Sequence, residues 1–441
     1  MQQIPEVSVF RFLSNSLRIL KNPLPFHHAK FEMLGDTFRL KLGFGNSVVF
    51  SRDPGFLQHV LQKNQKNYTK SPIQTKDLAK YVGKGLLTSE GELWQQQRKL
   101  IQPAFHKKQL VNLLSSIQSA IDSELSKIKI NQPFDVFPVF NDLAFQTVVQ
   151  ALFSNAANQA QINKLQNITE EVQKMLVKEL RQPYLNWWFR GSGKIKRHLQ
   201  YIQEARDILR ELVSDRKKSN IRHDDLLDML LDARYEDGEE MDEEQLIDEI
   251  LILFTAGHET TSNALTFAAL LIASNPESQQ QILNEINDFK NDEQSLMENL
   301  KSSPYTTSVI EETMRLYPPA YFIDRINIEE DVYSDTQIPK GSNLLFSLYE
   351  IHRHKNFWDD PLKFKPSRFL NKQKKTYSSH YFPFGAGPRM CIGNNFAMYE
   401  MVMTVQSLVK NYKIDTKETP IEILPLITLK PKNAILVFQK R

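Results

Sequence analysis

Residues 384–393 read Phe-Gly-Ala-Gly-Pro-Arg-Met-Cys-Ile-Gly, and this stretch contains the one cysteine among the 441 residues of the chain. A lone thiol cannot form an internal disulfide bond or a multi-cysteine zinc site, so Cys391 is either a small buried apolar residue or a thiolate used in chemistry. The glycines permit backbone conformations closed to other residues and let a flat ligand approach the main chain. Arg389 adds a positive charge suited to a carboxylate partner. From these features alone, a turn with an inert cysteine and a chemically used thiolate are about equally favoured.

The spacing within this stretch resembles a known family signature. Position for position it matches Phe-x-x-Gly-x-Arg-x-Cys-x-Gly, which is typical of the cytochrome P-450 family, the haem-thiolate monooxygenases. The resemblance implies haem b with Cys391 as the axial iron ligand, Arg389 on a haem propionate and Phe384 beside the sulfur. It also implies a mainly α fold with small β-sheets, in which the haem lies between a long central helix and the cysteine loop.

Length and composition agree with this family without identifying it. No Gly/Ser linker, low-complexity tract or repeat divides the sequence, so we expect a single haem domain over residues 1–441. The net charge of +3 implies no nucleic-acid partner. One cysteine and no recognisable signal peptide favour a reducing, cytoplasmic setting.

The first residues predict no transmembrane segment. The apolar run over residues 7–13 is broken by Ser8 and Arg11, well short of the roughly 20 residues that a spanning helix needs. Without such an anchor, we expect a soluble, monomeric protein of the bacterial type. Because the sequence ends soon after the cysteine region, we also expect no fused reductase domain.

Residues 242–274 predict the second organising element, a long helix. Acidic residues fill its first turn, as the helix dipole favours, and Asn275-Pro276 ends it. The middle, residues 250–254, is apolar on every side, which indicates burial all round. We therefore expect a central core helix.

Within this helix lies the polar segment Ala256-Gly257-His258-Glu259-Thr260-Thr261. In an arbitrary helix, Thr260 would bond to the Ala256 carbonyl and Glu259 would reach water. The segment, however, resembles the family pattern Ala/Gly-Gly-x-Asp/Glu-Thr. That resemblance implies that Ala256 leaves room for dioxygen on the iron, while Glu259 and Thr260 relay protons to it. We expect His258 to be structural.

Four further arginines resemble family positions. Trp94 and Arg98 lie one helical turn apart, and an ordinary half-buried Trp with a solvated Arg would explain them. Their pattern Trp-x-x-x-Arg, followed by Pro103-Ala104-Phe105, resembles the family's haem-propionate helix. Arg325 falls where the family carries another propionate arginine. Glu312 and Arg315 match Glu-x-x-Arg and, with Arg368, are expected to form a buried ion network of structural role.

Other segments predict local structure only. Alternation predicts strands over residues 37–42 and 48–50, and Asp53-Pro54 predicts a helix start. The acidic residues 224–244 predict a solvated helix and loop. The aromatic and basic residues 184–197 suit a substrate entrance, contact with an anionic membrane surface, or packing between lid helices.

The family resemblance implies a reaction and partners. A thiolate opposite dioxygen favours O–O cleavage, and the two electrons must come from a separate ferredoxin or flavodoxin with its NAD(P)H reductase. Exposed lysines are candidates for the docking face, or equally solvated side chains without a partner: Lys107, Lys108, Lys372, Lys374 and Lys375.

The sequence specifies the substrate less closely than it specifies the cofactor or the reaction. The motif layout resembles the branch that includes long-chain fatty-acid hydroxylases, so an apolar substrate is expected, with a fatty acid first and a terpenoid or carotenoid next. Three other functions remain open: a peroxide-driven peroxygenase, a haem-thiolate isomerase or dehydratase, and a non-enzymatic haem sensor. The Glu259-Thr260 pair argues against the first two, because neither reaction needs it.

Overall fold

The computed structural model describes residues 3–43, 45–154, 156–219, 221–289, 295–370, 377–416 and 420–441. The chain divides into two units, each assembled from stretches far apart in sequence. The sheet unit comprises residues 1–71, 307–391 and 420–432, and the helical unit comprises residues 72–306, 392–419 and 433–441. The expectation of a single haem domain over residues 1–441 stays a prediction.

A six-stranded sheet of order β1-β2-β3-β9-β6-β4 organises the sheet unit. Its strands are β1 (Glu6–Val7), β2 (Thr37–Gly43), β3 (Asn46–Ser51), β9 (Asn343–Ser347), β6 (Phe322–Asn327) and β4 (Tyr68–Thr69). The two predicted strands are confirmed as β2 and β3, which pair antiparallel with Phe38 opposite Phe50. Those two rings stack with centroids 5.2 Å apart, so alternate residues of the hairpin enter the core.

Short helices and two hairpins complete the sheet unit. They are α1 (Val9–Lys21), α2 (Leu24–Leu34), α3 (Pro54–Gln58), most of α16 (Pro304–Leu316), α17 (Leu348–Ile351), the hairpin β7 (Asp331–Tyr333)–β8 (Thr336–Ile338) and the hairpin β11 (Ile423–Pro425)–β12 (Leu429–Pro431). The predicted helix start at Asp53 is confirmed, because its side chain accepts bonds from Gly55 N (2.8 Å) and Phe56 N (3.2 Å).

The helical unit contains the remaining helices and a small sheet. The helices are α4 (Ala79–Val82), α5 (Gly91–Ile101), α6 (Lys107–Leu110), α7 (Leu114–Leu125), α8 (Phe137–Phe153), α9 (Gln159–Arg181), α10 (Asn186–Gly191), α11 (Lys194–Ser219), α12 (Leu226–Asp232), α13 (Glu243–Ala273), α14 (Pro276–Asn287), α15 (Leu296–Lys301) and α19 (Asn394–Asn411). The sheet has the order β10 (Tyr412–Asp415), β13 (Ile435–Lys440) and β5 (Pro133–Asp135).

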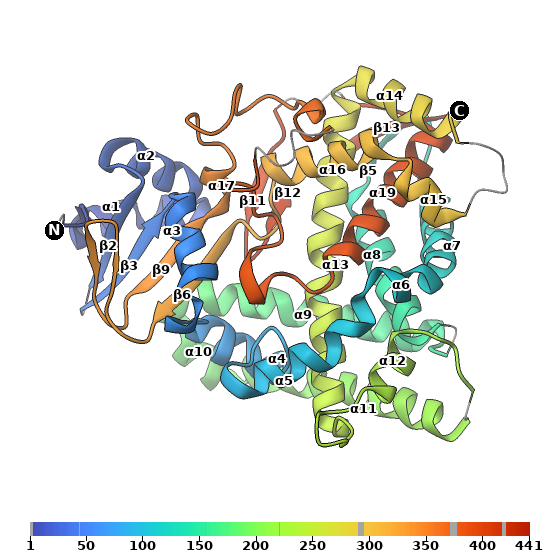
Figure 1. The fold of residues 1–441 in the computed structure, drawn as a ribbon, viewed down its shortest axis with the longest axis horizontal. Helices are drawn as coiled ribbons and strands as arrows, with labels where there is room; N and C mark the ends of the chain where they lie inside the picture. Colours follow the sequence, from blue (N-terminus) through green and yellow to red (C-terminus); the bar gives the residue numbers. More distant parts are fainter. Residues whose placement is uncertain are drawn as a thin grey trace. The chain divides into compact units, whose positions relative to one another are not determined.

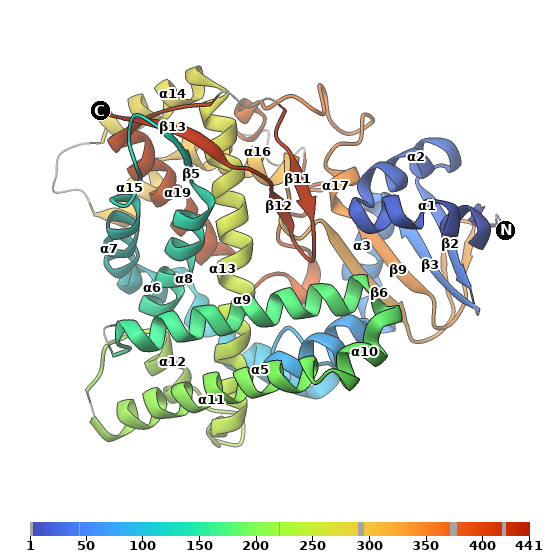
Figure 2. The ribbon, with the colours of Figure 1, turned by 180° about the vertical axis from the view of Figure 1, so that it is seen from behind.

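The predicted central helix is confirmed as α13, with 31 residues. Asp242 caps it by accepting a bond from Gln245 N at 2.9 Å. The helices α8 and α19 pack along α13 within the helical unit (Figure 1). On another side of the unit, α9 and α11 lie side by side (Figure 2). The helix α13 thus lies inside the helical unit, and it fixes the positions of the side chains in its middle.

The acidic segment over residues 224–244 is less solvated than its sequence predicts. Asp225 and Asp228 are buried, and both accept bonds from buried Arg216 in α11, at 2.8 and 2.6 Å. The leucines of α12 are buried too. The prediction of a purely solvated helix was wrong because the arginine that neutralises these acids stands in another helix.

No helix in the described part of the chain combines the length and the apolar character that a membrane crossing requires. This finding does not bear on the exposed faces of α1 and α10, because a helix can lie on the surface of a bilayer without spanning it.

Candidate functional site

The cysteine loop, residues 382–391, closes on itself through its backbone. Cys391 N donates to Phe384 O at 2.9 Å, and Gly385 N donates to Phe382 O at 3.0 Å. A 3₁₀ turn over Gly387–Arg389 lies between these bonds. The Cys391 side chain is exposed. The loop therefore presents its thiol to a ligand instead of packing it into the core, which argues against the inert alternative.

Gly387 is required by a close backbone approach. It has φ = +70°, and a Cβ at this position would lie 2.0 Å from the carbonyl oxygen of Leu61. No other residue type fits this contact without a backbone shift. The glycine thus lets the cysteine loop lie directly against the segment around Leu61.

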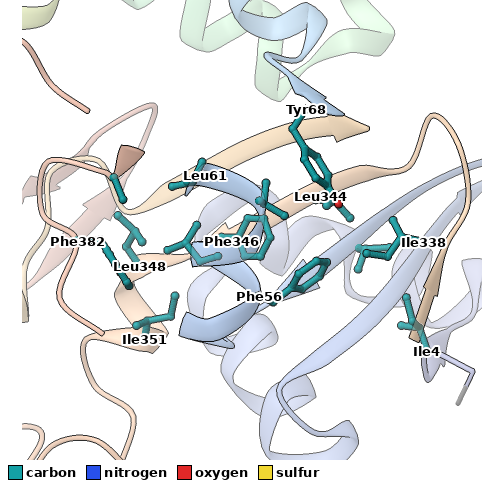
Figure 3. Packing of buried hydrophobic residues seen from close by; sticks show 14 residues of the cluster. Ile4, Phe56, Leu61, Tyr68, Ile338, Leu344, Phe346, Leu348, Ile351 and Phe382 are labelled. Carbon is teal, nitrogen blue, oxygen red and sulfur yellow. The ribbon is translucent and has the colours of Figure 1, made fainter. Parts of the chain in front are cut away.

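A core cluster holds the start of the loop. Phe382 packs there with Leu61, Phe346 and Leu348 (Figure 3). Its backbone N–H donates to His352 Nε2 at 2.9 Å. Burial, followed by the charge of nearby Arg315, holds the pKa of His352 well below its usual value, so the ring is neutral and can accept this bond. The start of the loop is therefore fixed by the apolar packing of the Phe382 side chain and by the hydrogen bond from its backbone N–H to His352.

Glu312, Arg315 and Arg368 form a buried ion network, which we call the arginine network. Arg315 donates to both oxygens of Glu312, at 2.7 and 2.8 Å, and Arg368 Nε donates to the same carboxylate at 3.2 Å. Arg315 also donates to the carbonyls of His352 (2.8 Å) and Pro361 (2.7 Å). This confirms the predicted network. Because the same guanidinium binds two carbonyls of residues 352–361, the network ties that loop to α16.

The middle of α13 is partly accessible, at Thr255 and Glu259 as well as along one row of residues. Ala256 is exposed, and Leu253, Gly257 and Thr260 are half-buried, whereas most of the helix from Leu246 to Ala273 is buried. These four positions are spaced i, i+3, i+4 and i+7, which places them on a single helix face. The burial predicted for residues 250–254 is confirmed except at Leu253. We call this side the open face of α13.

The polar residues beside the open face differ in what they contact. Thr260 Oγ1 donates to Ala256 O at 2.7 Å, the bond that the purely structural interpretation expected. His258 is buried, its Nδ1 is 2.9 Å from Phe254 O, and its ring meets the edge of Phe145. These contacts give His258 a structural role, as predicted. Glu259 is half-buried.

The sequence-predicted site residues fall into two groups. Phe384, Arg389 and Cys391 share the cysteine loop, and Arg325 is buried in β6 of the same unit. In the helical unit, Trp94 is buried and Arg98 is half-buried on α5, while Ala256, Glu259 and Thr260 lie on α13. The predicted helical spacing of Trp94 and Arg98 is confirmed, whereas the roles of all these residues stay predictions.

The residues fit a haem in three respects. An accessible thiol on a closed, glycine-lined loop supplies the donor that a haem-thiolate iron needs. Guanidinium groups, which suit carboxylates geometrically, are available at Arg325 and Arg389 in the sheet unit and at Arg98 in the helical unit. The exposed Ala256 presents only a methyl group at the open face, which leaves room there for a ligand on α13, whereas Gly257 is packed against Val148 of α8.

One buried acid was missed by sequence reasoning. Glu400 of α19 is fully buried, and Thr147 Oγ1 of α8 donates to its Oε1 at 2.6 Å. Burial raises the pKa of Glu400 to about 8. The signal was available in the sequence: a lone carboxylate within the otherwise largely apolar residues 396–403 costs free energy unless it is protonated or paired.

The sequence and the fold of this chain are similar to those of known proteins. A sequence profile described as cytochrome P450 matches residues 5–438. The chain is 26% identical over 404 residues to a cyclooctat-9-en-7-ol 5-monooxygenase of Streptomyces melanosporofaciens, covering 91% of this chain and 87% of that protein. It is 28% identical over 415 residues to a taurochenodeoxycholic 6 alpha-hydroxylase of Sus scrofa, covering 88% and 81%. The crystal structure of a cytochrome P450DA heme domain superposes with a TM-score of 0.87 at 18% identity, covering 100% of this chain and 98% of that one.

Proposed function

The chain belongs to the cytochrome P450 family and is a haem monooxygenase, and from this premise we propose that it hydroxylates an apolar lipid. A long-chain fatty acid is the first candidate, and a terpenoid or carotenoid is the second. The named relatives support an apolar scaffold without choosing among these, because they act on a cyclooctatenol and on a taurochenodeoxycholic compound.

The observation that carries the proposal is the open face of α13. Its four residues Leu253, Ala256, Gly257 and Thr260 are uncharged, and the half-buried Glu259 lies beside them. A hydrocarbon chain that lies against these four positions and leaves Glu259 uncovered desolvates no ion. The hydroxyl of Thr260 is the polar group of the face, and its placement suits work on oxygen better than recognition of a substrate carboxylate.

Haem b, the cofactor of this family, supplies the iron centre at which dioxygen is activated. We assign Cys391 as the residue whose thiolate would hold the haem iron. Arg389, Arg325, Arg98 and Trp94 are assigned to its propionates, because guanidinium and indole N–H groups donate to carboxylates. Phe384 is assigned to the side of the loop next to the sulfur, where its ring would limit water.

The proposed proton path uses Thr260 and Glu259. Thr260 Oγ1 donates to Ala256 O at 2.7 Å. A hydroxyl has one donor and two acceptor lone pairs, so in this state Oγ1 can still accept a proton from a neighbouring donor. Rotation of the hydroxyl then directs its own proton toward the open face. Glu259, half-buried at the preceding position, is proposed to take up a proton from solvent and to deliver it to this side of α13, from which the Thr260 hydroxyl is reprotonated.

A separate ferredoxin or flavodoxin is the proposed electron donor. Lys107 and Lys108 are exposed on α6 and suit an acidic partner. Lys372, Lys374 and Lys375 lie outside the described residues. Exchanging Lys107 and Lys108 for glutamine should slow electron transfer mainly at low ionic strength, where unscreened charges steer association.

The assignment of Cys391 is tested by the spectrum of the reduced, carbon-monoxide-bound protein. The parent should show the strongly red-shifted Soret band of a thiolate ligand, and Cys391→Ala should lack it. Met390→Ala is the matched control, since it removes a neighbouring exposed side chain from the same loop and should keep the band. Identical spectra for parent and Cys391→Ala, both loaded with haem, contradict the assignment.

The substrate class is tested by titrating the haem-loaded protein with fatty acids of increasing chain length, a terpenoid alcohol and a carotenoid. Binding near the iron should shift the Soret band, and turnover with NADPH and a surrogate ferredoxin pair should give a hydroxylated product. A fatty-acid product supports the first candidate. A response to the terpenoid or carotenoid alone replaces the fatty acid and leaves the monooxygenase intact.

A further inference from the structure

The helix α1 carries three large apolar side chains on its outer side. Phe10 and Leu17 are each 81% exposed and Leu13 is 59% exposed. Their spacing of i, i+3 and i+7 places them on one face of the helix. Exposed apolar residues scattered singly are normal, but a contiguous set on one helix marks an interaction surface. We call these three residues the apolar ridge.

The ridge is not needed for packing within the sheet unit. The opposite side of α1 supplies Phe12, which packs against the core cluster of Val7, Phe31, Phe38, Leu40 and Phe50. The helix is capped by Ser8, whose side chain accepts from Arg11 N. The helix is therefore attached by one face, and its apolar ridge faces outward.

The charges that α1 itself carries beside the ridge all have one sign. Arg11, Arg18 and Lys21 lie on α1 and are exposed, and the helix contains no aspartate or glutamate. Arg11 and Arg18 each follow a ridge residue directly in sequence, and Lys21 lies one turn beyond Leu17. Cations that flank an apolar ridge complement a surface that is both anionic and apolar beneath its charges.

We propose that α1 binds the surface of an anionic lipid bilayer, with the apolar ridge inserted at the level of the headgroups and the three cations on the lipid phosphates. With 13 residues, the helix is about 20 Å long, too short to span, so it lies along the surface. The inference stands on α1 alone and does not depend on the substrate.

The test measures how the full-length, haem-loaded protein sediments with lipid vesicles. The probes are vesicles of phosphatidylcholine alone and vesicles of phosphatidylcholine mixed with phosphatidylglycerol. The parent should bind the mixed vesicles, bind the neutral ones at least about tenfold more weakly, and dissociate as salt is raised.

Two sets of variants separate the apolar and the charged contributions. Phe10→Ser with Leu13→Ser and Leu17→Ser should reduce binding to the mixed vesicles by at least about tenfold. Arg11→Gln with Arg18→Gln and Lys21→Gln should reduce it similarly and remove its salt dependence. All six side chains are solvent-facing, so the unfolding temperature and the carbon-monoxide spectrum should stay unchanged.

Matched controls replace exposed apolar residues elsewhere. Ile328→Ser with Val332→Ser and Leu362→Ser removes three exposed apolar side chains of the same unit and should leave vesicle binding intact. Tyr184→Ser with Trp187→Ser and Trp188→Ser tests the exposed aromatic residues at α10.

Several results overturn the proposal. They are failure of the parent to bind mixed vesicles, undiminished binding by the ridge variant, and equal loss in the Ile328 control. Loss confined to the α10 variant assigns the membrane contact to that helix instead of α1. A ridge variant that changes the parent's oligomeric state, without a change in vesicle binding, assigns the ridge to protein contact.

Discussion

The arginine network and the polar segment of α13 both bring polar side chains into apolar surroundings, but they satisfy them differently. In the network, one carboxylate receives two guanidinium groups, and those groups bind backbone carbonyls in turn. On α13, Thr260 bonds only within its own helix turn and stands on a face that remains accessible.

This difference separates a motif that stabilises the fold from a motif whose side chains can take part in a reaction. A network whose members fully satisfy one another is costly to break and has no capacity left for a substrate. A hydroxyl on an open face keeps capacity to accept and pass a proton. The two motifs should therefore respond oppositely to mutation, one through stability and the other through turnover.

The largest effect is expected from Arg315→Leu. This change leaves the Glu312 carboxylate with half its charge partners and frees the carbonyls of His352 and Pro361. Removing one member of a buried pair costs about 3–5 kcal/mol, so the free energy of unfolding in denaturant should fall by that amount or the haem-loaded protein should not accumulate.

The matched control for the network is an ion pair on the surface of the same unit. Lys340 and Glu329 pair at 2.8 Å with both side chains mostly exposed, and Lys340→Gln should leave unfolding almost unchanged because exposed pairs contribute little. A loss for Arg315→Leu as small as that of Lys340→Gln would show that the network is not structural.

The second largest effect is expected in the cysteine loop, where the backbone at Gly387 lies against the carbonyl oxygen of Leu61. Gly387→Ala forces a Cβ to within 2.0 Å of Leu61 O in a left-handed conformation, whereas Gly341→Ala meets the same kind of conformation (φ = +75°) with nothing within 4 Å. The left-handed conformation alone costs about 1–2 kcal/mol.

Gly387→Ala should therefore destabilise the protein more than Gly341→Ala and should also disturb the thiolate Soret band, which Gly341→Ala should keep. The comparison is made by denaturant unfolding and by the carbon-monoxide spectrum of each variant. Equal stability and equal spectra for the two variants contradict the argument that the loop depends on this close approach.

Sequence predicted best where the determining contacts are short-range or where a motif is specific. The strands β2 and β3 follow from alternation, α13 from its caps and apolar middle, and the arginine network from a short motif. Sequence failed where a distant partner decides. Asp225 and Asp228 read as solvated acids because nothing local shows that Arg216 neutralises them. The roles of Cys391 and Thr260 remain predictions, since geometry within one unit does not test them.

The third effect is expected at Thr260, where stability should not change. Thr260→Ala removes the hydroxyl from the open face, and the yield of hydroxylated product per NADPH should fall by about 10- to 100-fold, with the reduced oxygen released as hydrogen peroxide. Thr260→Ser, which keeps the hydroxyl, should retain most of the yield.

The readouts for Thr260 separate a proton role from a packing role. Substrate-induced Soret shifts and the free energy of unfolding should be the same in the parent and in both variants. If Thr260→Ala instead weakens substrate binding while the yield per NADPH is kept, the hydroxyl serves the substrate and not the proton path.

The last effect, which depends on pH, is expected at Glu400, an intermediate case, because Thr147 satisfies one carboxyl oxygen while burial disfavours the charge. Its pKa of about 8 in the folded protein lies above the ordinary value of a glutamate, so the folded state binds the proton more tightly than the unfolded chain does. Stability from this group is therefore greatest at acidic pH and falls as the pH rises from about 4.5 toward 8, by up to roughly 1.4 kcal/mol per pH unit.

Glu400→Gln keeps the size of the side chain and an oxygen for Thr147, but it cannot ionise. The variant should unfold at a higher denaturant concentration than the parent at pH 8, and the difference should shrink as the pH approaches 5. Glu329→Gln, an exposed glutamate that pairs with Lys340, should give no such pH-dependent difference. A constant offset between parent and Glu400→Gln across this range would mean that Glu400 does not change its charge on unfolding. In that case Glu400 would resemble the arginine network, in which the polar groups satisfy one another's hydrogen bonds.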